Sequence, residues 1–258
     1  MKIEILLIKD IKKIMTDIDY YKIKIIADMC GYISGFLAWY FSYKLFFDKE
    51  NIFMPFRNLE EKIFYYLAIL WWWMFFWILV STFDDFIVKW AENWLLISKT
   101  VAGAIAGWVI SSEVFKKIYK IKFNKWVLFI PSLTIWIAVW RVWAFLIWLR
   151  DNTHWLATNL PWWYDYWDWI LRHPAQLYEI LVLSSILIIF IIWVRKHKSW
   201  WIENWFFIFT LIYFTYRFLV GFIMPYSHFW LWMNSIQVVA IWMIFYSIYK
   251  LKKYGYGK

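Results

Sequence analysis

The amino-acid sequence predicts an all-α, polytopic membrane protein of about seven transmembrane helices with an N-terminal interfacial helix. Of the 258 residues, 64% are hydrophobic, whereas a soluble domain contains roughly 45–50% apolar residues. The mean hydropathy is +0.52. Seven apolar segments each supply the roughly 20 helical residues needed to cross a bilayer. They are residues 24–47, 63–83, 94–114, 126–149, 176–194, 204–223 and 229–249.

The segment that precedes the first apolar stretch, residues 1–22, alternates Ile and Leu with Lys and Asp. It has neither a long apolar core nor a small-residue cleavage site, which favours an amphipathic interfacial helix over a signal peptide. We therefore expect three parts, namely this segment, a seven-helix transmembrane domain at 23–250 and a basic cytoplasmic tail at 251–258. Cys30 is the only cysteine, so no intramolecular disulfide forms, and its apolar surroundings favour simple packing.

The net charge of +10 is best interpreted through its distribution along a membrane chain, and it does not indicate a nucleic-acid partner. Lys and Arg are more numerous in the loops after the first, third and fifth apolar segments and at the C-terminus than in the remaining loops. The excess predicts a cytoplasmic C-terminus and an outer N-terminus. The basic residues of 1–22 are the feature that opposes this orientation.

Tryptophan and glycine have unusual frequencies, with 25 Trp and 7 Gly, although glycine is normally about 7% of residues. Many tryptophans occupy helix interiors or turns instead of membrane interfaces. We hypothesise that many of them are glycines in the native protein, encoded by UGA codons that the organism reads as glycine. The alternative is a genuinely tryptophan-rich protein. The positions concerned are Trp71, Trp72, Trp73, Trp136, Trp140, Trp143, Trp148, Trp167 and Trp169, whereas Trp162 is interpreted as a true tryptophan.

Trp136 and Trp140 have the four-residue spacing of close helix contacts. The same spacing relates small residues in the preceding apolar segment, which are Ala102, Gly103, Ala106 and Gly107.

Two arginines lie within apolar segments, Arg141 in the fourth and Arg217 in the sixth. A guanidinium at the bilayer centre costs at least roughly 2.5–3.5 kcal/mol, so it is usually matched to an anion, a carbonyl group or a water-filled cavity. The alternative is that each side chain extends to an interface.

The long outer loop between the fourth and fifth segments is dense in polar groups. Arg172 offers a bidentate fork for phosphate and His173 a base or acid near neutral pH. Ordinary loop and helix-cap roles are the alternative for each of these residues. The other candidates around this loop are Asp151, Gln176, Tyr178 and Glu179.

The seventh segment begins with the polar patch Asn234–Gln237, for which hydrogen bonding between helices is the default interpretation. The chain has no phosphate-binding Gly loop, no His/Cys cluster with metal-ligand spacing and no Ser/His/Asp order. We therefore expect no metal and no other cofactor.

The string Arg172–Glu179 reads RHPAQLYE and resembles the RHPxQLYE motif of the prolipoprotein diacylglyceryl transferase family. The resemblance runs from about residue 31 to residue 249, as for a divergent member. Further similar strings are Arg141–Trp143 (RIG in the family), Pro161–Trp163 (PWG), Trp167–Trp169 (GDG), Ala102–Gly107 (GGLIGG), Arg217–Val220 (the second arginine region) and Ser235–Gln237 (the last polar motif). Three of these match better when Trp is read as Gly.

The resemblance implies a multi-pass protein of the bacterial inner membrane with an outer N-terminus and a cytoplasmic C-terminus. It implies transfer of a diacylglyceryl group from phosphatidylglycerol to the lipobox cysteine of a preprolipoprotein signal peptide. Arg141, His173 and Arg217 are then the expected catalytic residues, with the arginines stabilising phosphate charge and His173 accepting the thiol proton. The expected substrate-binding residues are Arg172, Gln176, Tyr178, Glu179, Asp151 and Gln237.

Polar groups of the family pattern are missing at several positions of this chain. The family's His falls on Val101, two Asn fall on Ala144 and Ile147, and a Glu falls on Gly221. These departures keep two alternatives open, a catalytically silent homologue that binds lipids and a transporter or flippase that binds phospholipid head groups. A transporter predicts broken helices and a pseudo-repeat, and the sequence contains no repeat.

Overall fold

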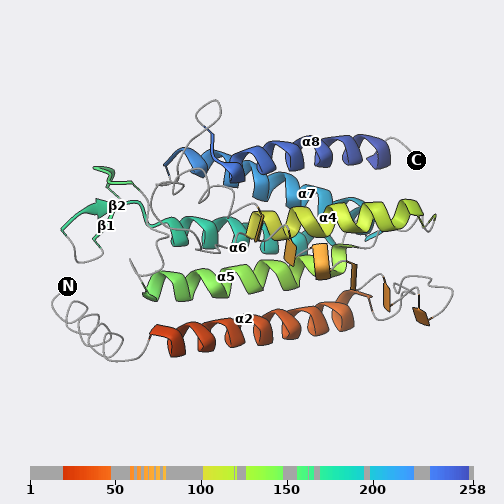
Figure 1. Ribbon diagram of the computed structural model, residues 1–258, viewed down its shortest axis with the longest axis horizontal. Helices are drawn as coiled ribbons and strands as arrows, with labels where there is room; N and C mark the ends of the chain where they lie inside the picture. The colour runs from red at the N-terminus through yellow and green to blue at the C-terminus, as the bar shows by residue number, and fades with distance from the viewer. Residues whose placement is uncertain are drawn as a thin grey trace. The chain divides into compact units, whose positions relative to one another are not determined.

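The structure is a computed structural model, and it is mostly helical in the residues that it describes (Figure 1). These are residues 20–47, 101–118, 120, 126–147, 156–161, 163–165, 169–194, 198–223 and 233–255, together with part of the stretch 59–79. The predicted all-α class is confirmed for this part of the chain. Residues 1–19, most of the expected interfacial segment, lie outside the described residues.

The helices follow the apolar segments of the sequence. Helix α2 spans Tyr20–Ser42 and continues in the π-helical turn η1, Tyr43–Phe47. Helix α2 therefore begins before residue 22, the boundary expected for the interfacial segment. The later elements are α4 (Val101–Ile118), η2 (Trp126–Phe129), α5 (Ile130–Ile147), α6 (Ala175–Val194), α7 (Lys198–Val220), η4 (Gly221–Ile223) and α8 (Ser235–Gly255).

Two helical stretches in the described part of the chain, Ala175–Trp193 and Asn204–Ile223, are long and apolar enough to cross a membrane. A third apolar stretch, Ile130–Leu146 in α5, is shorter. Length and apolar composition are the basis of this assignment. Helix α8 continues to Gly255, so Lys252 and Lys253 lie in its last turn and not in an extended tail.

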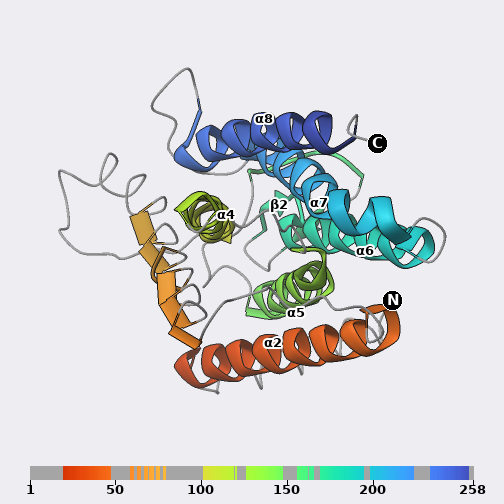
Figure 2. The same ribbon diagram turned by 90° about the vertical axis from the view of Figure 1, so that its right-hand side faces the viewer.

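The chain divides into two compact units, and the boundary between them falls within α6. The first unit comprises Met1–Phe46 and Leu128–Ile189, and the second comprises Phe47–Val127 and Phe190–Lys258. In the first unit, α2 and α5 lie side by side in both ribbon views (Figures 1 and 2). In the second unit, α8 packs along α7 and also contacts α4.

The α2–α5 contact is built on small residues of α2. A Cβ atom at Gly31 would lie 3.1 Å from Cδ1 of Trp136, and one at Gly35 would lie 3.2 Å from its Cβ atom. The indole of Trp136 also stacks on Tyr32, with 6.2 Å between ring centroids. Trp136 therefore occupies the close-approach surface that two glycines one helical turn apart provide.

The neighbouring tryptophan on α5 has a polar partner on α2. Trp140 Nε1 donates a hydrogen bond of 2.8 Å to Oδ1 of Asp28. A carboxylate in an apolar helix needs such a donor, because an unpaired charge there is expensive.

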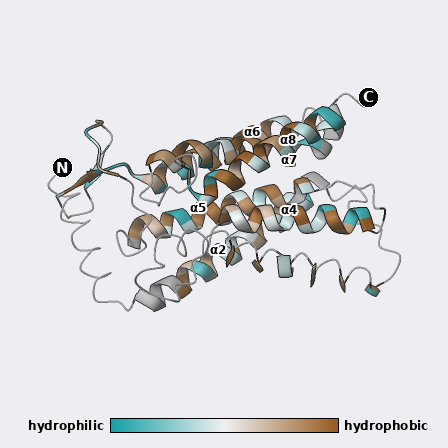
Figure 3. Ribbon diagram, turned by 45° about the horizontal axis from the view of Figure 1, so that its top comes forward, coloured by the Kyte–Doolittle hydropathy of each residue, from teal (hydrophilic) through white to brown (hydrophobic). Residues whose placement is uncertain are grey.

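The core of the second unit is aromatic. Fully buried side chains of α7 include Trp205, Phe206, Phe209, Tyr213 and Phe214. A hydrogen bond of 2.7 Å joins the hydroxyls of Thr210 on α7 and Ser247 on α8 within this core. Pairing these hydroxyls satisfies polar groups that the apolar surroundings cannot. Figure 3 shows the resulting pattern, with brown apolar helices and hydrophilic residues at the C-terminal end of α8.

The loop between α5 and α6 contains a small strand ladder that the sequence did not predict. Strands β1 (Tyr164–Asp165) and β2 (Leu171–Arg172) pair antiparallel, and Arg172 also bridges to Ala157. Strands of two residues are too short to produce an alternating apolar pattern. Between them, Trp169 has a φ of 61° and is 92% exposed.

Candidate active site on the first unit

The RHPAQLYE string joins the strand ladder to helix α6. Arg172 ends β2, and Pro174 accepts hydrogen bonds from the backbone N–H groups of Leu177 (3.0 Å) and Tyr178 (3.3 Å). Proline suits this position because the first N–H groups of a helix have no partner within it and the ring fixes a helical φ. The motif therefore places Gln176, Tyr178 and Glu179 in the first turns of α6.

A buried ion pair connects α5 to this helix. Nε of Arg141 lies 2.9 Å from Oε2 of Glu179, and the two side chains are 8% and 3% exposed. Removing either partner would leave a buried charge, which typically costs about 3–5 kcal/mol. The guanidinium that the sequence singled out is therefore matched to an anion, as expected for a charge within an apolar helix.

A second pair, His173 with Tyr178, lies at the same end of α6. Nδ1 of His173 is 3.1 Å from the Tyr178 hydroxyl, and the two rings meet edge to face at 6.0 Å. Partial burial of the imidazole lowers the pKa of His173 below its ordinary value of 6.5, because desolvation disfavours the charged form. The neutral ring thus predominates at neutral pH, which is the state that a general base requires.

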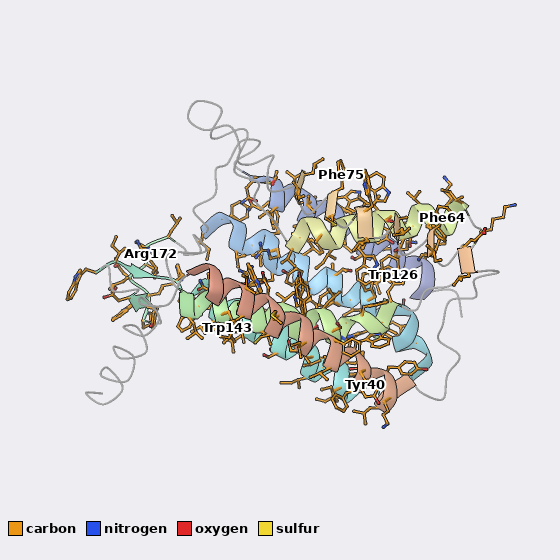
Figure 4. The ribbon with its side chains drawn as sticks, turned by 60° about the horizontal axis from the view of Figure 1, so that its bottom comes forward. Tyr40, Phe64, Phe75, Trp126, Trp143 and Arg172 are labelled. Atoms are coloured by element: carbon orange, nitrogen blue, oxygen red, sulfur yellow. The ribbon has the colours of Figure 1, made fainter. Side chains whose placement is uncertain are left out.

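Arg172 is held through its backbone by the ladder on both sides, opposite Tyr164 and Ala157. Its Nη1 donates a hydrogen bond of 3.4 Å to the Ile170 carbonyl, and the side chain is partly exposed. Figure 4 shows Arg172 on this ladder. The ring of Phe145 on α5 lies 5.0 Å from that of Tyr164, so the end of α5 contacts the ladder.

Gln176 and Asp151 are the other substrate-binding residues that the sequence predicted in this region. Gln176 is 1% exposed, on the same face of α6 as Glu179. Asp151 lies outside the described residues, as does Trp162. Ala144, one of the positions at which the sequence departs from the motif that it resembles, is 3% exposed.

In the second unit, Arg217 is on α7 and is 3% exposed. Nearby on the chain, Asn234 and Gln237 form a reciprocal capping box at the start of α8. The Gln237 N–H donates to Oδ1 of Asn234 at 2.9 Å, and the Asn234 N–H donates to Oε1 of Gln237 at 3.0 Å. This arrangement satisfies two N–H groups at the helix start.

The same two side chains connect α8 to the end of α7. Nε2 of Gln237 donates to the Phe218 carbonyl at 3.1 Å, and Nδ2 of Asn234 donates to the Gly221 carbonyl at 3.4 Å. The hydrogen bonding between helices that the sequence suggested for this patch is therefore present. A Cβ at Gly221 would lie 2.5 Å from Cγ of Gln237, so this position has no room for a side chain unless Gln237 moves.

One polar cluster of the second unit was not predicted, namely Glu113 and Lys116 of α4 with Lys250 of α8. Its only sequence signal is the three-residue spacing of Glu113 and Lys116 at the end of an apolar helix. Within the described residues, no three His, Cys, Asp or Glu side chains gather as a metal site. The chain matches no protein-family model and no curated protein sequence.

Proposed function

We propose that this chain is a multi-pass membrane enzyme that transfers a diacylglyceryl group from phosphatidylglycerol to the lipobox cysteine of a preprolipoprotein. The observation that carries the proposal is the buried ion pair between Arg141 of α5 and Glu179 of α6, next to the His173–Tyr178 pair. The proposal combines these contacts with the family resemblance of the sequence.

Integration into a membrane is supported by the surface of the helices. Large apolar side chains recur on one face of α2 and are more than half exposed, namely Ile25, Met29, Ile33 and Phe36. A soluble protein rarely exposes an apolar patch of this kind. Together with the two long apolar stretches in α6 and α7, this supports integration into a membrane. The seven-helix topology with an outer N-terminus and a cytoplasmic C-terminus is proposed from the apolar segments and the charge distribution of the sequence.

The proposed reaction is a displacement at carbon. The thiolate of the acceptor cysteine attacks the carbon of the diacylated glycerol unit of phosphatidylglycerol that is bonded to the phosphate oxygen. A carbon–sulfur bond forms, the carbon–oxygen bond breaks, and its electron pair leaves with glycerol phosphate. His173 takes up the thiol proton, because a thiol with a pKa near 8.5 is mostly protonated at neutral pH.

The tautomer of His173 decides which nitrogen accepts this proton. If Nδ1–H donates to the Tyr178 hydroxyl, Nε2 becomes the acceptor atom. The 3.1 Å contact is compatible with this arrangement. Tyr178 is therefore proposed to orient the base and not to react.

The arginines stabilise the negative charge that develops on the leaving phosphate. Glu179 holds the guanidinium of Arg141 through its Nε atom, so we assign it a positioning role. Arg172 supplies a partly exposed cation beside His173. Arg217 is included on the strength of the resemblance.

The test is transfer of radiolabelled diacylglyceryl from phosphatidylglycerol to a lipobox peptide, using protein with the suspect tryptophans restored to glycine. Arg141→Ala should abolish transfer, and Arg141→Lys should reduce it strongly because lysine lacks the planar fork. Lys253→Ala, which removes an exposed charge on α8, is the matched control. Equal activity of Arg141→Ala and the control would refute the assignment of Arg141.

A silent lipid-binding homologue is the second candidate, and the buried Ala144 favours it. That function predicts phosphatidylglycerol binding without transfer in any version of the chain. Absence of transfer in the glycine-restored protein, together with lipid binding that depends on Arg141, would establish this candidate in place of the enzyme.

A further inference from the structure

The contact between α2 and α5 extends along both helices to the level of Arg141. A Cβ atom at Gly35 would lie 3.2 Å from Cβ of Trp136, and two turns earlier on α2 the carboxylate of Asp28 meets Trp140. Lower residue numbers on α2 therefore face higher numbers on α5, so the two helices run in opposite directions. This register places an acidic side chain of α2 opposite the residue that precedes Arg141.

Trp140 connects Asp28 to the guanidinium of Arg141. Its Nε1 donates a hydrogen bond of 2.8 Å to Oδ1 of Asp28, and its ring centroid lies 5.8 Å from Cζ of Arg141. This separation is within the range of about 6 Å over which a cation is attracted to an aromatic face. Glu179 lies 2.9 Å from Nε of the same guanidinium. A connected series of side chains in the first unit thus runs from α2 through α5 to α6.

The carboxylate of Asp28 restricts the indole that lies beside Arg141. An acidic side chain within an apolar helix is costly, and such residues usually have a function. Pairing with an indole N–H satisfies the carboxylate, but it also has a consequence for the ring, because the ring cannot turn about its side-chain torsions without breaking the bond. A fixed ring limits the orientations that the neighbouring guanidinium can take, as a preorganised binding group requires.

We propose that Asp28 is a positioning residue, which holds the Arg141 guanidinium through Trp140 in the orientation that binds the phosphate of the phospholipid. The inference rests on the phosphate-binding role proposed above for Arg141. Without the Asp28 bond the indole can rotate, and the guanidinium can turn from the phosphate toward Glu179. Glycine cannot replace Trp140 in this role, so the native protein is expected to have tryptophan at position 140.

The experiment is a titration of the purified full chain with phosphatidylglycerol in mild detergent, followed by native mass spectrometry. The chain keeps Trp140 and has glycine at the other suspect positions. Asp28→Leu removes the acceptor and should raise the Kd about fivefold, the effect of losing about one hydrogen bond. Asp28→Asn keeps an acceptor oxygen and should bind within about twofold of the parent. Ser34→Leu is the matched control on the same helix, because its hydroxyl bonds to the Gly31 carbonyl of α2, and it should leave the Kd unchanged.

Transfer kinetics separate positioning from a loss of folded protein. Asp28→Leu should raise the KM for phosphatidylglycerol and leave the KM for the lipobox peptide unchanged, because Arg141 is proposed to bind the lipid phosphate. A smaller folded fraction would lower the apparent kcat and change neither KM. Helical circular dichroism checks that each variant is folded.

A double-mutant cycle tests whether Asp28 acts through the indole. Trp140→Phe keeps a ring but removes the N–H donor, so adding Asp28→Leu to it should raise the Kd little further. Additive losses would overturn the proposal, as would parental affinity in Asp28→Leu or an Asp28→Asn affinity as weak as that of Asp28→Leu. Glycine at position 140 in peptides of the native protein would also overturn it.

The two proposals of this article fail in different ways in this titration. If Arg141→Ala removes phosphatidylglycerol binding and Asp28→Leu does not weaken it, the role of Asp28 alone is refuted. If Arg141→Ala binds the lipid as well as the parent does, the phosphate-binding role of Arg141 is refuted and the role of Asp28 with it. If the lipid binds in an Arg141-dependent way but is not transferred, the silent homologue replaces the enzyme, and the Kd values still decide the role of Asp28.

Discussion

Arg141 on α5 and Glu179 on α6 form a buried ion pair of 2.9 Å, although 38 positions separate them in the sequence. Arg141 was predicted as a functional residue because its guanidinium lies in an apolar segment. Glu179 is the last residue of the RHPAQLYE string. Because both side chains are almost fully buried, each stabilises the charge of the other.

Glu179→Ala is expected to lower the stability of the first unit by about 3–5 kcal/mol, because it leaves the Arg141 guanidinium buried and unmatched by Glu179. The double variant Arg141→Met with Glu179→Met should recover most of this stability, since it removes both charges. It should nevertheless remain inactive in transfer. The measurements are thermal unfolding in detergent and the lipobox-peptide assay. Recovery of activity in the double variant would contradict the role of Arg141.

His173 should give the transfer rate an acidic limb below neutrality, because burial lowers its pKa from 6.5 and the base is protonated only at lower pH. His173→Gln should abolish transfer without unfolding the protein. Tyr178→Phe should retain the limb but shift it to lower pH, since the hydroxyl no longer accepts a hydrogen bond from the protonated ring. The measurement is kcat/KM against pH, and a profile unchanged in Tyr178→Phe would exclude the orienting role.

The lowered pKa of His173 also determines how the free energy of unfolding changes with pH. Between the lowered pKa of folded His173 and 6.5 in the unfolded chain, the unfolded state binds more protons. Stability should therefore rise with pH across this window and fall as the pH drops through it. Urea unfolding at several pH values measures the slope, and the contribution should vanish in His173→Gln.

Trp169→Gly is expected to stabilise the protein by about 0.5–1 kcal/mol. A left-handed backbone costs an L-residue roughly 1–2 kcal/mol, and glycine returns part of that gain as chain entropy. The side chain is 92% exposed and its φ is 61°, so little packing is lost. Lys120→Gly, at a φ of 55°, should gain similarly, whereas Trp193→Gly inside α6 should destabilise.

The conformation of Trp169 also supports the codon hypothesis, because a turn with positive φ is where glycine is preferred. Peptide sequencing of the native protein by mass spectrometry should find glycine at position 169 and a total mass below 32.2 kDa. Tryptophan at position 169 in the native protein would end the hypothesis for this site.

Gly221→Ala is expected to cost about 1–3 kcal/mol, because its Cβ would overlap the Gln237 side chain and displace the capping box. In a Gln237→Ala background the same change should cost much less, since the obstructing atoms are gone. Thermal unfolding of the four proteins of this cycle measures the coupling. Equal costs in both backgrounds would mean that the overlap is relieved elsewhere.

The helices of this protein were predictable because apolar composition over roughly twenty residues is a local property of the sequence. The segments expected at 126–149, 176–194 and 204–223 correspond closely to η2–α5, α6 and α7–η4. The strand ladder and the start of α2 were not predictable, since two-residue strands and helix ends leave little periodicity. The candidate residues of α6 were predicted from the RHPAQLYE string, because a contiguous motif can be recognised in the sequence alone.

The sequence by itself therefore determined which segments are helical and apolar, and which residues form a charged string at the start of α6. Only the tertiary structure decided that Arg141 meets Glu179, that Lys250 meets Glu113, and that Trp136 lies over Gly31 and Gly35. Partners on different helices depend on how each helix is rotated and offset when it packs. That choice is made by the fit of side chains across the interface, which no single stretch of sequence contains.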